Sequence, residues 1–180
     1  MAEKYWMSNT EYLLVTSKVP IVCSDLVILR YMELGENPIH GKPAPSGRNY
    51  QDLETLLLRR KTGYESGKWC IIGGRQWKGE RAAEAIKRHA ADVGVKVEVI
   101  APFSIDFPAW INDNPEQDRT KHSISRVYPV KIISGEPREE GEEFKGIKWF
   151  SVTELPEMAY DHRAEILKAV EQLKKFGGKI

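Results

Sequence analysis

The chain has 180 residues, of which 41% are hydrophobic and 29% are charged, a composition typical of a globular protein. Lys and Arg number 27 and Asp and Glu 26, so the net charge of +1 argues against non-specific nucleic-acid binding as the main role. No apolar run approaches the roughly 20 residues of a membrane span. The N-terminal residues also lack the basic-then-apolar order of a signal peptide. We therefore expect a single domain over residues 1–180, in the cytoplasm.

Two cysteines, Cys23 and Cys70, are the only ones in the chain, and each lies in an apolar stretch. Cysteine in such surroundings usually behaves as a small buried hydrophobic residue. We predict two buried free thiols in a reducing compartment. No histidine cluster accompanies them, so zinc is not indicated.

A short helix and a long strand are predicted at the start of the chain. Ser8 followed by Glu11 is typical of a capping box and predicts a helical segment over about 8–19. Residues 21–31 are mostly β-branched or apolar and predict a strand. One acidic residue, Asp25, interrupts that strand.

A turn-rich insertion follows over about 32–51, with three prolines and three glycines. Loops of this length are uncommon inside compact domains and are often functional. Residues 53–60 are a strand candidate, although the first six of them would also suit a helix. Residues 69–72 predict a further strand, which we expect to stop at the glycine pair 73–74.

The clearest helix covers 80–92, which is rich in alanine and is followed by Gly94. Further elements are predicted as strands over 95–105, 123–133 and 145–150, a loop over 108–121 and an amphipathic helix over 165–175. Because strands and helices alternate, the fold class is α/β (α+β) with a mixed sheet.

The glycine pair 73–74 and the helix after it form the most informative stretch of the sequence. Two glycines after a strand allow the backbone to approach a ligand closely. The helix aligns Glu80, Glu84 and Arg88 on one stripe, because residues four apart are neighbours on a helix face. Asp92 continues the stripe. The carboxylates of this stripe could hold Mg²⁺, which prefers oxygen ligands. Alternatively, the stripe could be a solvent-exposed helix face with several ion pairs.

The same stretch resembles the Nudix box, G-x5-E-x7-R-E-U-x-E-E-x-G-U, in which U is apolar. Gly74, Glu80 and Arg88 match its first glycine, first glutamate and arginine. His89 stands where the family has a glutamate, and Asp92 alone represents the paired glutamates. The resemblance implies a Nudix fold, with a mixed curved β-sheet sandwiched between helices.

Beyond the box, about residues 8–160 are similar to the GDP-mannose mannosyl hydrolases of the same superfamily. The matching positions are Pro20 with Asp25, Arg60 with Trp69, Gly73-Gly74-Arg75, Asp118 with Thr120 and His122, and 148–155. This likeness implies hydrolysis of a nucleotide sugar at the sugar carbon, which releases a nucleoside diphosphate and a free sugar. It also implies a homodimer, to which residues 1–19 could contribute. The balanced charge and the lack of an apolar span predict neither a nucleic acid nor a membrane as partner.

The resemblance also assigns residues to the diphosphate and to a metal ion. Arg60 and Arg75 would bind the diphosphate, since guanidinium groups suit phosphate oxygens. Asp92 and the backbone of Gly74 would hold Mg²⁺ or Mn²⁺ against the phosphates. Asp25 is a candidate contact for the metal or the sugar.

Two histidines and an ion pair complete the prediction. His122 is the candidate general base, because histidine side chains titrate near neutral pH. His89 is a further candidate metal or sugar contact. Glu80 and Arg88 are expected to form a structural ion pair, and Trp77 could stack on a base or sugar.

Two other functions fit the same residues. One is a pyrophosphohydrolase that cuts the P–O–P bond of a nucleoside diphosphate compound. The other is a catalytically inactive Nudix-fold module that binds a nucleotide. The reaction products would discriminate between the first of these and the mannosyl-hydrolase chemistry.

Overall fold

The computed structural model describes residues 8–32, 49–118, 120–178 and 180. Most of the predicted insertion over 32–51 lies outside these residues. The elements are α1 (Asn9–Thr16), β1 (Ile21–Tyr31), a short 3-10 turn (Tyr50–Asp52), β2 (Leu53–Arg60), β3 (Trp69–Cys70), β4 (Ile72–Arg75), α2 (Ala82–Asp92), β5 (Val95–Val99), β6 (Trp110–Asn112), β7 (Ser123–Gly135), β8 (Phe144–Ser151) and α3 (His162–Phe176).

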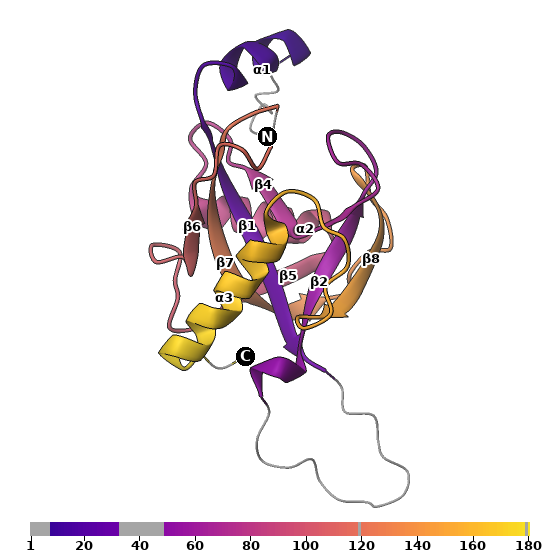
Figure 1. The fold of residues 1–180 in the computed structure, drawn as a ribbon, viewed down its shortest axis with the longest axis vertical. Coiled ribbons are helices and arrows are strands. Elements are labelled where there is room, and N and C mark those ends of the chain that lie inside the picture. The colour runs from indigo at the N-terminus through magenta and orange to yellow at the C-terminus, as the bar shows by residue number, and fades with distance from the viewer. Residues whose placement is uncertain (1–7, 33–48, 119, 179) are drawn as a thin grey trace, which may run out of the picture.

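Strand β1 is the centre of a mixed sheet that separates α2 from α3 (Figure 1). It runs parallel to β7, with Ile21 beside Ser123, and antiparallel to β2 and β4. Strand β8 extends the sheet beyond β2, and β5 and β6 pair with β7. The predicted fold class, a mixed sheet between helices, is confirmed.

The side chains of β1 alternate between two hydrophobic cores. Val27 and Leu29 pack with Ile166 of α3, whereas Leu26 and Ile28 belong to the core under α2. This alternation follows from the period of two along a strand. Since Asp25 lies two residues before Val27, its carboxyl group is on the α3 face of the sheet.

Helix α1 begins as predicted. The Ser8 hydroxyl accepts a hydrogen bond from the backbone of Glu11, and the Glu11 carboxylate accepts one from the Ser8 backbone. The helix stands away from the sheet (Figure 1), and its Leu13 and Leu14 are exposed. Tyr12 lies 4.9 Å from the Arg75 guanidinium. The homodimer contact through this segment stays a prediction.

The prediction that a strand ends at Gly73 is wrong, because β4 continues through both glycines to Arg75. Gly73 pairs with Asp25 of β1. A Cβ atom at residue 73 would lie 2.3 Å from the Asp25 Oδ1 atom, so only glycine permits this approach. The glycine pair is therefore part of the sheet.

Two further boundaries differ from the prediction over 95–121. The strand predicted over 95–105 ends at Val99, and the chain turns where the Phe103 N–H donates to the Ile100 carbonyl. Pro102 cannot donate to a strand ladder, which explains the early end. Within the predicted loop, residues 110–112 form β6 on the edge of β7.

Both cysteines are buried free thiols, as predicted. The cytoplasmic location that we infer from them stays a prediction. Among the described helices, none combines the length and the hydropathy that crossing a membrane requires.

Candidate functional site

Asp25 lies at the centre of a buried polar cluster on the α3 face, beneath the exposed backbone of Gly73. Its carboxylate accepts hydrogen bonds from the Ser125 hydroxyl and from the N–H of Gly74. Burial raises the pKa of Asp25 to about 6, against the opposing effect of these hydrogen bonds and of the Lys121 ammonium. The carboxyl group is thus held rigidly next to an open strand backbone.

Two cations flank the ring of Tyr160 beside this carboxyl group. The Arg60 Cζ atom and the Lys121 Nζ atom each lie 5.2 Å from the ring centroid. Lys121 forms an ion pair with the buried Asp118. Burial, with the charges of Arg60 and Lys121, lowers the pKa of His162 to about 3, so this imidazole is neutral.

Three buried polar atoms in this cluster have no hydrogen-bond partner: Arg60 Nε, His162 Nδ1 and Glu165 Oε2. His162 and Glu165 lie one turn apart on α3. An unpartnered buried polar group costs roughly 1–3 kcal/mol, so native structures hold few of them. Electrostatic interactions connect these groups, from Arg60 to His162 and from Glu165 to Asp25, and such a connected set is typical of a site that is completed by a ligand.

Glu165 is fully buried and carries a proton at neutral pH. Its Oε1 atom accepts a hydrogen bond of 2.8 Å from the Asn112 amide. Burial, reinforced by the negative charge of Asp25, raises its pKa to about 8. The cluster therefore holds a neutral carboxylic acid beside a carboxylate.

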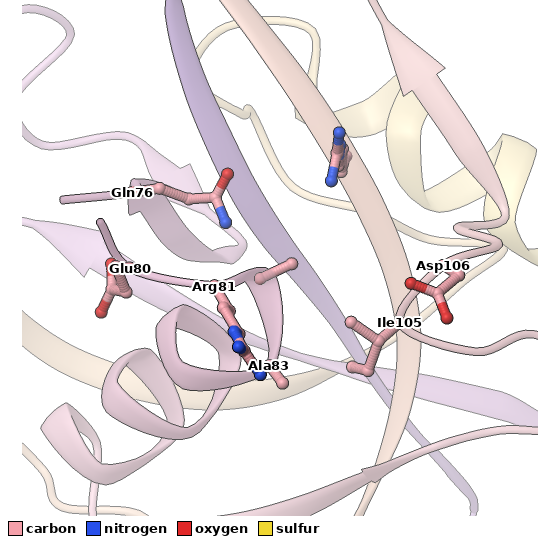
Figure 2. A pocket seen from close by; sticks show the side chains of 8 residues that line it. Gln76, Glu80, Arg81, Ala83, Ile105 and Asp106 are labelled. Carbon is pink, nitrogen blue, oxygen red and sulfur yellow. The ribbon is translucent and has the colours of Figure 1, made fainter. Parts of the chain in front are cut away.

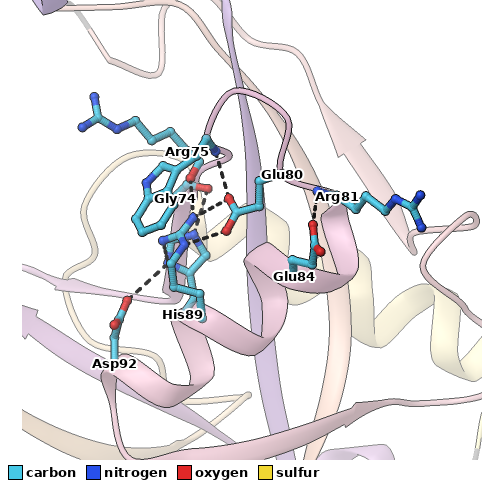
Figure 3. A network of polar contacts seen from close by, with 9 residues as sticks. Gly74, Arg75, Glu80, Arg81, Glu84, His89 and Asp92 are labelled. Atoms are coloured by element: carbon cyan, nitrogen blue, oxygen red, sulfur yellow. Dashed lines mark hydrogen bonds and ion pairs between the residues drawn. The ribbon is translucent and has the colours of Figure 1, made fainter. Parts of the chain in front are cut away.

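On the opposite face, Glu80 and Arg88 fix the loop between β4 and α2 (Figure 3). The Arg88 guanidinium donates from Nε and Nη2 to the two Glu80 carboxylate oxygens, each at 2.7 Å. Its Nη2 atom also donates to the Arg75 carbonyl, and its plane lies over the Trp77 ring. Both Glu80 oxygens are thereby engaged within the protein.

His89 is buried between α2 and β4, and both of its ring nitrogens have partners (Figure 3). Nε2 lies 3.2 Å from the Gly74 carbonyl oxygen, and Nδ1 lies 3.3 Å from the Arg88 Nη1 atom. Burial and the Arg88 charge lower the pKa of His89 to about 4. Because an arginine only donates, Nδ1 accepts and the Nε2–H donates to Gly74. The ring offers no lone pair to a metal.

Asp92 is the last residue of α2. Its side chain is 64% exposed, and Oδ2 lies 3.9 Å from the His89 Nδ1 atom. Within the residues that the structure describes, no group of three His, Cys, Asp or Glu side chains could hold a metal ion. These donors do not fit a divalent cation that is held by protein ligands. The metal assignment to Asp92 and Gly74 stays a prediction.

His122 precedes β7 and contacts Asp113, which follows β6. Its Nε2 atom lies 2.7 Å from the Asp113 Oδ1 atom, and a third of its side chain is exposed. Since a carboxylate can only accept, Nε2 carries the proton and Nδ1 is the basic atom. The His122 carbonyl accepts from the Ile21 N–H, which brings the pair to the end of β1 that adjoins Arg75.

A cleft of about 490 Å³ lies on the α2 face (Figure 2). Gln76, Arg81 and Asp106 line it together with Arg126 of β7. Arg126 follows Ser125, which bonds Asp25, so the two side chains point to opposite faces of the sheet. This cleft is thus separate from the cluster around Asp25.

The structure brings Asp25 and Arg60 into one cluster, and strand pairing with Cys23 puts Arg75 on the same face. His89 and Asp92 lie apart from them, at the end of α2. Sequence reasoning did not single out Lys121, His162 and Glu165. A glutamate on the apolar stripe of the last helix, next to Ile166, is the signal that would have indicated the last of these.

A model of the NUDIX domain matches residues 47–170. A curated relative, the ADP-ribose pyrophosphatase of Methanocaldococcus jannaschii, is 28% identical over 124 residues, which are 69% of this chain and 70% of the relative. The mannosyl-hydrolase branch stays a prediction, because this relative bears a different name.

Two solved structures share the fold. The NUDIX domain of Shewanella oneidensis NrtR, complexed with ADP ribose, is 20% identical, with a TM-score of 0.62 over 93% of this chain and 99% of that one. A mutT/nudix family protein from Listeria innocua is 25% identical, with a TM-score of 0.60 over 88% of this chain and 97% of that one. Fold, box and family model agree, and the chain belongs to the Nudix family.

Proposed function

We propose that the protein binds a nucleoside diphosphate sugar on the α3 face of the sheet and hydrolyses it at the sugar carbon. The observation that carries this proposal is the gathering of three unpartnered buried polar atoms beside Asp25, under the exposed backbone of Gly73. One relative is named an ADP-ribose pyrophosphatase, and one structure of similar fold is a complex with ADP ribose, a member of the same chemical class. On this face of the sheet, guanidinium groups can bind a diphosphate and carboxyl groups can bind sugar hydroxyls.

His122 is the base in this mechanism. Its Nε2–H donates a hydrogen bond to Asp113, with 2.7 Å between Nε2 and Oδ1, which leaves Nδ1 to accept a proton from water. The water oxygen bonds to the sugar carbon while the bond from that carbon to the diphosphate oxygen breaks. The electron pair of the broken bond stays on the diphosphate, and Arg60, Lys121 and Arg75 offset its negative charge.

Attack at phosphorus is the competing reaction, and the residues at the box positions argue against it. Both Glu80 oxygens bond to Arg88, and His89 occupies the place of a box glutamate with both nitrogens engaged. Asp92 is then the one box carboxylate that remains exposed. The His122–Asp113 pair is better equipped to remove a proton from water.

The products of turnover in water labelled with heavy oxygen test this proposal. GDP-mannose and ADP-ribose are each incubated with the protein, and products are identified by chromatography and mass spectrometry. Attack at the sugar carbon yields a nucleoside diphosphate and a labelled sugar. A nucleoside monophosphate and a sugar phosphate, one of them labelled at phosphorus, would overturn it in favour of a pyrophosphohydrolase.

A substitution then assigns the base. We expect His122→Gln to lower kcat by about 100-fold or more and to leave the Kd of the nucleotide sugar unchanged. Lys168→Gln, on the exposed side of α3, is the matched control and should leave both constants unchanged. Tight binding without turnover by the unaltered protein would instead identify a nucleotide-binding module.

A further inference from the structure

We propose that the diphosphate of the ligand is bound by fixed side-chain cations, chiefly Lys121 and Arg60, and that a divalent metal ion is not required for binding. This inference rests on the proposed function, because it concerns how the same site holds its ligand. It differs from the usual Nudix arrangement, in which the box carboxylates hold the metal.

The first argument is the donor set of the box. Arg88 occupies both oxygens of Glu80, and the Glu84 carboxylate accepts a hydrogen bond of 2.8 Å from the Arg81 backbone. His89 donates to Gly74, so the Gly74 carbonyl that would face a metal is already bonded. Among the residues that the structure describes, no group of three His, Cys, Asp or Glu side chains that could hold a metal ion includes Asp92.

The second argument is the charge on the α3 face. The Lys121 ammonium pairs with the buried Asp118 and lies 5.2 Å from the centroid of the Tyr160 ring, and its charge acts on Asp25 and His162. Its side chain is 20% exposed. A partly buried ammonium in this position can stabilise phosphate oxygens where other enzymes use a metal ion.

The third argument is the unsatisfied donor on Arg60. Its Nε atom is buried without a partner, while its Nη2 atom makes a long contact of 3.5 Å to the Thr62 carbonyl. A guanidinium group stays charged at all accessible pH values and binds phosphate through paired hydrogen bonds. A phosphate oxygen would supply the missing acceptor.

Calorimetric titration tests the inference with two probes, GDP-mannose and ADP-ribose, in buffer with excess EDTA and in buffer with excess MgCl₂. We expect the probe that binds to have the same Kd in both buffers. MgCl₂ titrated into the protein alone should give no saturable heat. Binding that appears only with MgCl₂ would overturn this inference and leave the proposed function standing.

Substitutions separate the two sets of residues. Lys121→Met and Arg60→Met should each weaken binding in EDTA by about tenfold or more, whereas Asp92→Asn should leave the Kd unaltered. Lys168→Gln is the surface control. Circular dichroism establishes that each variant is folded, and Lys121→Arg, which keeps the charge, should restore part of the affinity.

Loss of binding in Asp92→Asn would overturn the inference, as would unchanged binding in both Lys121→Met and Arg60→Met. Absence of binding of both probes in both buffers would overturn the proposed function with it.

Discussion

Arg88 organises the loop between β4 and α2 through contacts with four groups. It bonds both oxygens of Glu80, the Arg75 carbonyl and the His89 ring, and its plane covers Trp77. The pair is largely buried, with side-chain exposures of 19% for Arg88 and 9% for Glu80. Removing one partner of such a pair leaves an uncompensated charge.

We therefore expect Arg88→Met to lower the free energy of unfolding by about 3 kcal/mol, as measured by urea denaturation. The double variant Glu80→Gln with Arg88→Met should lose less, because no buried charge is left without a partner. An equal or larger loss in the double variant would show that packing on Trp77, and not charge, dominates.

At the scale of elements, the close approach of β4 to β1 creates the exposed floor of the site. Besides the Asp25 Oδ1 atom, a Cβ at residue 73 would lie 2.7 Å from the Asp25 Cα and from the Ser24 carbonyl oxygen. Two of these atoms are backbone atoms, which cannot move aside without shifting a central strand. The two strands would have to separate to admit any side chain.

We expect Gly73→Ala to destabilise the fold by about 2 kcal/mol or more, because it forces overlap with β1. Gly79→Ala is the matched control: its φ of 80° also favours glycine, yet nothing lies within 4 Å of the added Cβ. It should cost about 1 kcal/mol. Similar losses in both variants, measured by thermal unfolding, would argue against a steric origin.

At the scale of the whole molecule, buried titratable groups set how stability depends on pH. The pKa values of His89 and His162 are lowered from 6.5 to about 4 and about 3, so acid stabilises the unfolded chain by protonating these histidines. The pKa values of Asp25 and Glu165 are raised instead, to about 6 and about 8. These two carboxyl groups stabilise the folded protein fully at pH values below their pKa in the unfolded chain. This stabilisation is lost as the pH rises through their pKa in the folded protein.

Between pH 7 and 8.5, Glu165 makes the largest change among these four groups, because the histidines of the unfolded chain have released most of their protons by pH 7 and Asp25 is largely ionised in both states. We expect the free energy of unfolding to fall by about 1 kcal/mol over this range, because the folded protein binds a proton that the unfolded chain has released. Glu165→Gln keeps the acceptor for Asn112 and should abolish the slope. A slope of equal size in that variant would assign the effect to another group.

Local sequence signals predicted most of the elements. Three of these signals are the Ser8–Glu11 capping box, the β-branched run over 21–31 and the alanine-rich stretch before Gly94. Each determines the local structure of residues that are close to it in the chain. The course of β4 depends instead on a partner strand far away in the sequence, and so its extension beyond Gly73 was missed. Pairing with the edge of β7 likewise made 110–112 a strand.

The sequence predicted residues of the candidate site only where their spacing matched the pattern of a known family. Asp25, Arg60 and Arg75 were proposed from their spacing relative to proline, tryptophan and glycine residues. Lys121 precedes β7 and comes near Asp25 through the pairing of β7 with β1, whereas His162 and Glu165 belong to α3 and come near it through the packing of α3 on the sheet. The hydrogen bonds of His89 also depend on tertiary structure, since Gly74 lies fifteen residues earlier in the chain.

The hydrogen bonds of the Gly74 peptide groups restrict which residue can stand at position 89. The Gly74 N–H bonds to Asp25 on one face, and its carbonyl accepts from His89 on the other. A glutamate at residue 89 would set a carboxylate, which cannot donate, against that carbonyl. We therefore expect His89→Glu to give a less stable protein.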